Sequence, residues 1–165
     1  GKGTIYKHFE TKDEIYLLLM IRYEEELAQM FRRIEESPAD KEQLAKEFFL
    51  FRIKDPKRYM LFDRLEQKLV AARAVPELLG RLHRIRASNA EVLTRIVKAR
   101  IDDGALEDVP PYFHVCAAWA LAHGAVALMQ SEFYNKVIED KAGFLDYLLS
   151  TGIRMGNRGQ YKKMS

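Results

Sequence analysis

Apolar residues recur every three or four positions along most of the chain, which is the spacing of one face of an α-helix. The clearest stripe follows Thr11 and extends from Ile15 to Ile34. Thr11 and Glu14 match a capping box, in which a hydroxyl and a carboxylate bond the unpaired amides at a helix start. The spacing therefore predicts a long helix that begins after Thr11 and ends at Ser37-Pro38, because the residue before a proline disfavours the helical conformation.

Prolines and glycines divide the rest of the chain into further helical segments, and no segment shows the alternation of a strand. Asp55 is placed to cap one helix, and Gly104 is placed as the left-handed residue after another. The fold class predicted is all-α. The helices expected after the first run from Ser37 or Asp40 to Asp55, from Pro56 to Val75, from Pro76 to Asp103, from about 108–111 to about Tyr134, and from about Asp140 to Met155.

The helix expected after residue 108 is apolar or small on nearly every side, so we expect both of its faces to be covered, one of them by another subunit or helix layer. It carries two histidines, a glutamine and two prolines without flanking basic anchors, which favours a buried helix over a membrane span. The polar tail that follows Arg154 is expected to fray.

Composition narrows the possible classes of protein. The chain has 165 residues, 48% hydrophobic and 31% charged, which fits one folded domain and excludes wholesale disorder. The single cysteine, Cys116, cannot form an intrachain disulfide, so a reducing, cytoplasmic compartment is expected. The sequence has no glycine-rich phosphate loop, no metal-ligand spacing and no nucleophile with a paired base. We therefore expect no enzyme activity, no metal and no cofactor.

The first residues carry the most specific pattern. The chain begins Gly-Lys-Gly-Thr-Ile-Tyr-Lys-His-Phe, and Lys12-Asp13-Glu14 follow after two further residues. This segment resembles the recognition helix and the next helix start of TetR/AcrR-family transcriptional regulators. The resemblance implies a TetR-like helical regulatory domain that follows the C-terminal remnant of a helix-turn-helix domain. Residues 1–36 would hold that remnant, with a recognition helix at about 2–9, and the connecting helix; residues 37–165 would bind ligand and dimerise.

The resemblance implies a ligand-responsive DNA-binding regulator, a repressor released from its operator by a small, largely apolar effector. The alternative is a helical ligand-binding or scaffold protein that does not bind DNA. Ile5 and Phe9, four residues apart, would hold the recognition helix on its own domain. The side chains suited to phosphates and base edges are Lys2, Thr4, Tyr6, Lys7, His8 and Lys12.

An effector pocket should be mostly apolar with a few polar groups. The aromatic residues among the candidates given below could instead be part of the hydrophobic core, and Arg86 could have a solvated or intrahelical partner. Residues 51–100 carry 13 Lys and Arg against 5 Asp and Glu, which raises the hypothesis of an anionic effector. The predicted ligand-binding residues are Phe48, Phe51, Tyr59, Phe62, His83, Arg86, Asn89, Trp119 and His123.

TetR-like proteins dimerise through their last two long helices, so the resemblance implies a homodimer. Small and leucine side chains on the last two long helices expected here could form that seam, although a core within one chain would explain the same residues. The predicted interface residues are Leu121, Ala125, Leu128, Leu145, Leu148 and Leu149.

A helix-turn-helix domain needs two helices before its recognition helix, roughly 35 to 45 residues that would precede Gly1. We therefore predict that the 165-residue chain alone binds DNA weakly and that the binding falls steeply with salt. A gel-shift titration checks this, and nanomolar affinity would contradict it.

Overall fold

The computed structural model describes residues 11–37 and 41–164, and within these ranges the chain is helical without a strand. The all-α prediction is thus confirmed. The residues predicted to contact DNA at positions 2 to 8 lie outside the described ranges. The described helices are α2 Lys12–Glu36, α3 Lys41–Ile53, α4 Pro56–Ala71, α5 Pro76–Asp102, α6 Pro111–Gln130, α7 Tyr134–Val137 and α8 Lys141–Arg154.

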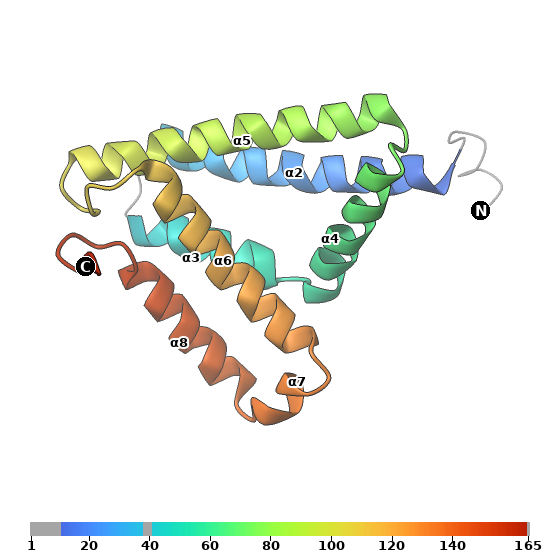
Figure 1. Cartoon of the computed structure of the whole chain (residues 1–165). Coiled ribbons are helices and arrows are strands. Elements are labelled where there is room, and N and C mark those ends of the chain that lie inside the picture. The colour runs from blue at the N-terminus through green and yellow to red at the C-terminus, as the bar shows by residue number, and fades with distance from the viewer. Residues whose placement is uncertain (1–10, 38–40, 165) are drawn as a thin grey trace.

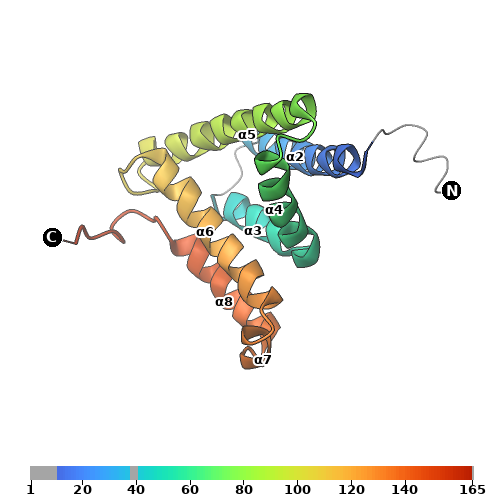
Figure 2. The ribbon, with the colours of Figure 1, turned by 45° about the vertical axis from the view of Figure 1, so that its right-hand side comes forward.

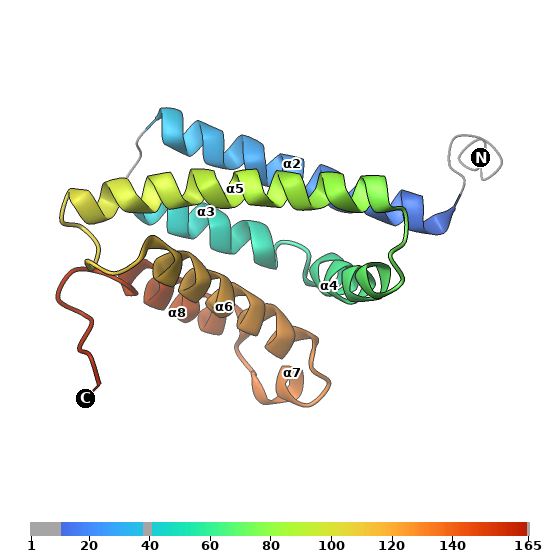
Figure 3. The same ribbon diagram turned by 45° about the horizontal axis from the view of Figure 1, so that its top comes forward.

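The two longest helices, α2 and α5, lie side by side and run in the same direction (Figures 1 and 3). The apolar stripe of α2 faces inward, and Leu17, Leu27 and Phe31 are fully or almost fully buried. Leu82 of α5 is fully buried in the same cluster. This pair of helices therefore carries the centre of the core, and the shorter helices pack against it.

The predicted helix starts are confirmed where a side-chain cap was expected. Thr11 Oγ1 accepts a hydrogen bond from the Glu14 amide at 3.2 Å, and Asp55 Oδ1 accepts one from the Arg58 amide at 3.0 Å. Gly104 follows α5 with a φ of +80°, as predicted for a left-handed cap. These local signals set most helix boundaries to within a residue or two.

The expected end of α6 near Tyr134 is wrong. The helix ends at Gln130 because Ser131 has an extended conformation, and Ser131 Oγ accepts a hydrogen bond from the Tyr134 amide at 3.3 Å. A short helix, α7, begins at Tyr134 and leads into α8, which lies beside α6 (Figure 2). Asp140 caps α8 by accepting from the Gly143 amide at 2.9 Å.

The described chain leaves one part of α6 open, so the expected cover by another subunit or helix layer stays a prediction. Ala122, Ala125 and Val126 are buried, but Tyr112 and Trp119 are 60% and 42% exposed. Within the chain α6 contacts α3, α4, α5, α7 and α8, and these contacts leave several of its large apolar side chains exposed. Among the described residues, α6 is the helix that is long and apolar enough to cross a membrane by length and composition.

Residues 156–161, which we call the C-terminal strap, do not fray as expected. Glu107 N donates to Gly156 O at 2.9 Å, and Arg158 N donates to Ala105 O at 3.2 Å. Leu106 and Asn157 form an isolated antiparallel bridge. The strap turns back over the body of the protein because Gly156 and Gly159 adopt φ values of +82° and +85°, which other residues rarely adopt.

We predict that Gly156→Ala destabilises the protein more than Gly159→Ala. Both changes place a side chain in the left-handed region, which costs about 1 to 2 kcal/mol. A Cβ at residue 156 would also lie 2.5 Å from His114 Nδ1, whereas a Cβ at residue 159 meets nothing within 4 Å. Urea unfolding of the two variants measures the difference. Equal losses of stability would show that His114 does not hold the strap in place.

Candidate ligand-binding site

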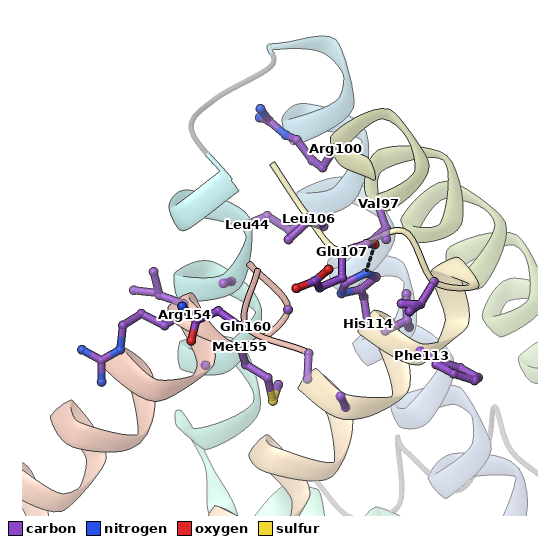
Figure 4. A pocket seen from close by; sticks show the side chains of 18 of the residues that line it. Leu44, Val97, Arg100, Leu106, Glu107, Phe113, His114, Arg154, Met155 and Gln160 are labelled. Atoms are coloured by element: carbon purple, nitrogen blue, oxygen red, sulfur yellow. Dashed lines mark hydrogen bonds between the residues drawn. The ribbon is translucent and has the colours of Figure 1, made fainter. Parts of the chain in front are cut away.

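A cavity of about 590 Å³ lies where α3, the end of α5, the start of α6 and the end of α8 meet (Figure 4). Its volume is in the range of sites for small organic molecules. Most of its lining is aliphatic or aromatic, and its polar groups come mainly from the segment after α5, the start of α6 and the end of the chain. Its lining includes Leu44, Phe48, Leu93, Val97, Arg100, Leu106, Glu107, Phe113, His114, Ala118, Thr151, Met155, Gly156, Gln160 and Tyr161.

Two side chains outside the strap, those of His114 and Glu107, contact it at one side of this cavity. His114 Nε2 is 3.0 Å from the Glu107 carbonyl oxygen (Figure 4), and a Cβ at Gly156 would lie 2.5 Å from His114 Nδ1. The carboxylate of Glu107 accepts a hydrogen bond from the Tyr161 amide at 2.9 Å. The pKa of Glu107 is lowered because this bond, followed by bonds from other strap amides, favours the ionised form. The stability that this carboxylate contributes is therefore fully present above the ordinary glutamate pKa and is lost as pH falls through the lowered pKa.

An aromatic cluster lies beside the cavity and surrounds the guanidinium of Arg52. The Arg52 side chain is 6% exposed, and its Cζ lies 5.2 to 5.5 Å from the ring centroids of Tyr23, Phe48, Tyr59 and Trp119. Arg52 Nη1 donates to Tyr23 Oη at 3.2 Å. Burial raises the pKa of Tyr23, while the Arg52 charge acts in the opposite direction.

The charge of Arg52 is not matched by a carboxylate. No ion pair joins it to any described residue, and its buried Nε has no hydrogen-bond partner. Cation–π contacts contribute about 2 kcal/mol or more when desolvated, whereas removing a charged group from water costs several kcal/mol. The four aromatic rings therefore stabilise the buried guanidinium, but they do not neutralise its charge.

A second polar cluster joins α2, α4 and α5. Glu24 of α2 is 4% exposed, and its Oε1 accepts a hydrogen bond from Arg86 Nε at 3.0 Å. Asn89 Nδ2 donates to the Glu24 backbone oxygen at 3.0 Å and to Glu24 Oε2 at 3.2 Å. Arg86 also pairs with Glu66 of α4, and His83 Nε2 lies 3.8 Å from Glu66 Oε1. These groups satisfy one another within the chain.

The sequence-predicted ligand residues are thus divided among three places. Phe48 lines the cavity and also contacts Arg52. Of the remainder, His83, Arg86 and Asn89 belong to the Glu24 cluster, where the partners of Arg86 are the chain's own carboxylates on other helices. The other five belong to the aromatic cluster around Arg52 and Tyr23, and they are Phe51, Tyr59, Phe62, Trp119 and His123. Within this cluster Tyr59 Oη lies 2.9 Å from His123 Nδ1.

Sequence reasoning missed the strap, His114 and Arg52. The glycines at 156 and 159 were a signal for tight turns in the tail, although nothing in the sequence showed what the tail would contact. Arg52 lies four residues after Phe48 on the apolar face of α3, and this spacing could have marked it as a buried cation.

The residues predicted at the dimer interface lie against the core of the single chain. Ala125 is 2% exposed, and Leu121 packs so closely on α8 that a Cβ at Gly152 would lie 2.9 Å from its Cδ2. Leu145, Leu148 and Leu149 of α8 are partly buried against the same core, and Leu128 is half-buried. The apolar surface that α6 exposes lies on another face of the helix. The homodimer stays a prediction.

Within the described ranges, no group of three or more His, Cys, Asp and Glu side chains is placed to hold a metal ion. Comparison of the sequence with protein-family models gave no match, and comparison with curated proteins gave none either. The function is therefore argued below from the residues and their geometry.

We predict that Arg86→Met lowers the free energy of unfolding by about 3 to 5 kcal/mol, because it leaves the buried Glu24 carboxylate without its charged partner. Arg81→Met is the matched control. Arg81 also joins α5 to α2, by a 2.8 Å bond to Glu25, but both side chains are about half exposed, and such pairs contribute about 0 to 1 kcal/mol. Denaturant unfolding compares the two variants; similar losses would contradict a special role for Glu24.

Proposed function

We propose that this protein is a ligand-responsive DNA-binding transcriptional regulator, a repressor that leaves its operator when a small, largely apolar effector occupies the cavity. The observation that carries the proposal is the position of α5. Its C-terminal half lines the cavity through Leu93 and Val97, and its length packs along α2, the helix that follows the segment resembling a recognition helix.

The contacts between α5 and α2 give the cavity a mechanical link to the N-terminal segment. Besides the buried Glu24 cluster, Arg81 bonds Glu25 at 2.8 Å and Arg95 bonds Glu35 at 2.8 Å. The pKa of Glu35 is lowered because Arg95 donates to its ionised carboxylate. A ligand that displaces the end of α5 would therefore move α2 with it, provided that the ligand prefers one of two helix arrangements.

The proposed DNA-reading surface consists of residues 2 to 8 together with Lys12. Lys12 is exposed at the first position of α2, where unpaired amides and the helix dipole also favour a phosphate. In a two-fold dimer, paired recognition helices would enter successive major grooves about one DNA turn apart.

The proposed homodimer is supported by the open face of α6. Residues on this face recur at helical spacing, and contiguous apolar surface on a soluble protein commonly marks an interaction site. The exposed members are Tyr112, Phe113, Cys116, Trp119 and Ala120. We place the second chain of the dimer on this face as part of the proposal. Native mass spectrometry tests whether the dimer forms.

Native mass spectrometry of the protein expressed from its own gene tests dimerisation and bound effector together. We expect a dimer, with added small mass if the effector survives purification. A selection from random-sequence DNA then tests DNA binding, followed by anisotropy titrations at several salt concentrations.

Lys2→Ala and Lys7→Ala should each make the fall of log affinity with log salt less steep by about one, because each removes one phosphate contact. Lys162→Ala, an exposed lysine at the other end of the chain, is the matched control. A dimer that retains ligand but selects no DNA would contradict the regulator and favour a helical ligand-binding protein.

A further inference from the structure

Two arginines with unmade hydrogen bonds flank one aromatic ring. In the described part of the chain, the buried side-chain nitrogen and oxygen atoms that lack a hydrogen-bond partner are Arg52 Nε and Arg58 Nε. Both guanidinium groups contact Tyr23, with Cζ-to-centroid distances of 5.5 Å for Arg52 and 5.1 Å for Arg58. Two guanidinium groups thus converge on one place between α2, α3 and α4, and the Nε of each makes no hydrogen bond.

The chain supplies little negative charge to these donors. Arg52 forms no ion pair with a described residue, whereas Arg58 Nε forms an exposed ion pair with Asp55 Oδ2 at 3.9 Å, one turn earlier. By contrast, the partly buried Arg86 is paired with both Glu24 and Glu66. A guanidinium that is buried without a carboxylate retains an unused donor for an anion, and the planar guanidinium suits a carboxylate best.

Phe48 connects this place with the cavity. Its side chain lines the cavity, and the centroid of its ring lies 5.4 Å from Arg52 Cζ, one helical turn further along α3. Ala118, which also lines the cavity, is the neighbour of Trp119, whose ring centroid is 5.2 Å from the same guanidinium. The Phe48 ring is therefore shared between the cavity lining and the shell of aromatic rings around Arg52.

We propose that Arg52 binds the carboxylate of an amphipathic organic acid whose apolar body occupies the cavity. Arg58, whose guanidinium also contacts the Tyr23 ring, adds a second positive charge. This inference rests on the proposed function only in taking the cavity as the effector site, and it specifies the chemical class of the effector. The aromatic rings would also suit a cationic ligand, but Arg52 already fills that position, and a second cation there would be repelled.

The test uses three probes with the same ten-carbon chain: decanoate, decanol and decyltrimethylammonium, each titrated at pH 8 below its aggregation concentration. Trp119 is the only tryptophan and lies against Arg52, so its fluorescence reports on this place directly. Calorimetry gives the affinities independently. We expect decanoate to bind at least about tenfold more tightly than decanol, the effect of one charge-assisted hydrogen bond, and the cation to bind least.

Arg52→Met should abolish the preference for decanoate and leave the affinity for decanol unchanged. Arg64→Met, an exposed arginine on α4, is the matched control and should keep the preference. The thermal midpoint of ligand-free Arg52→Met should be equal to or above that of the parent, because an unpaired buried charge is removed. If Arg52→Met does not fold, Arg52→Lys retains the charge without the Nε donor and should lose most of the preference.

Two results would overturn the inference: equal affinity for decanoate and decanol in the parent protein, or an unchanged preference in the Arg52 variants. Tighter binding of decyltrimethylammonium would also overturn it and would indicate a cation site. These results leave the proposed regulator intact, provided that the neutral or cationic probe binds the cavity and weakens DNA binding. Binding of none of the probes would count against both the acid site and the cavity as an effector site.

Discussion

The packing of α2 along α5 is the constraint on which the rest of the structure depends. It contains the most deeply buried leucines, and it also contains Glu24, a carboxylate that is stable there only because Arg86 and Asn89 bond it from the facing helix. Apolar stripes alone allow two helices to slide by a turn, whereas a buried charge with fixed partners permits one register. The positions of the cavity and of α4 follow from that register.

Two arginines in this protein have opposite surroundings. Arg86, whose side chain is 29% exposed, pairs with two carboxylates of the chain, while the buried Arg52 meets aromatic rings and one phenol. The first arrangement fixes a helix pair. The second leaves a charge that the chain does not neutralise, next to an apolar space, and this asymmetry is what distinguishes a structural arginine from a candidate binding residue in the same core.

Much of the fold was predictable because it is encoded locally. Thr11, Asp55 and Gly104 mark helix ends through short-range hydrogen bonds and backbone preference, and the three-to-four spacing identifies the helices. The site was less predictable because it depends on contacts between distant segments. Nothing near Gly156 indicates that it lies over His114, and nothing near Arg86 indicates that its partners are Glu24 and Glu66 rather than a ligand. Several of the aromatic residues predicted to bind ligand lie close together, but the chain's own Arg52 lies at their centre.

The course of the strap has a practical consequence for handling the protein. The chain's last described residues leave directly from the rim of the cavity, since Gln160 and Tyr161 line it and residues 162–164 are exposed. A label attached at residues 162–164 would therefore lie beside the cavity. Labelling the protein without obstructing the cavity calls for attachment elsewhere, and the exposed side chain of Lys68 on α4 offers one such position.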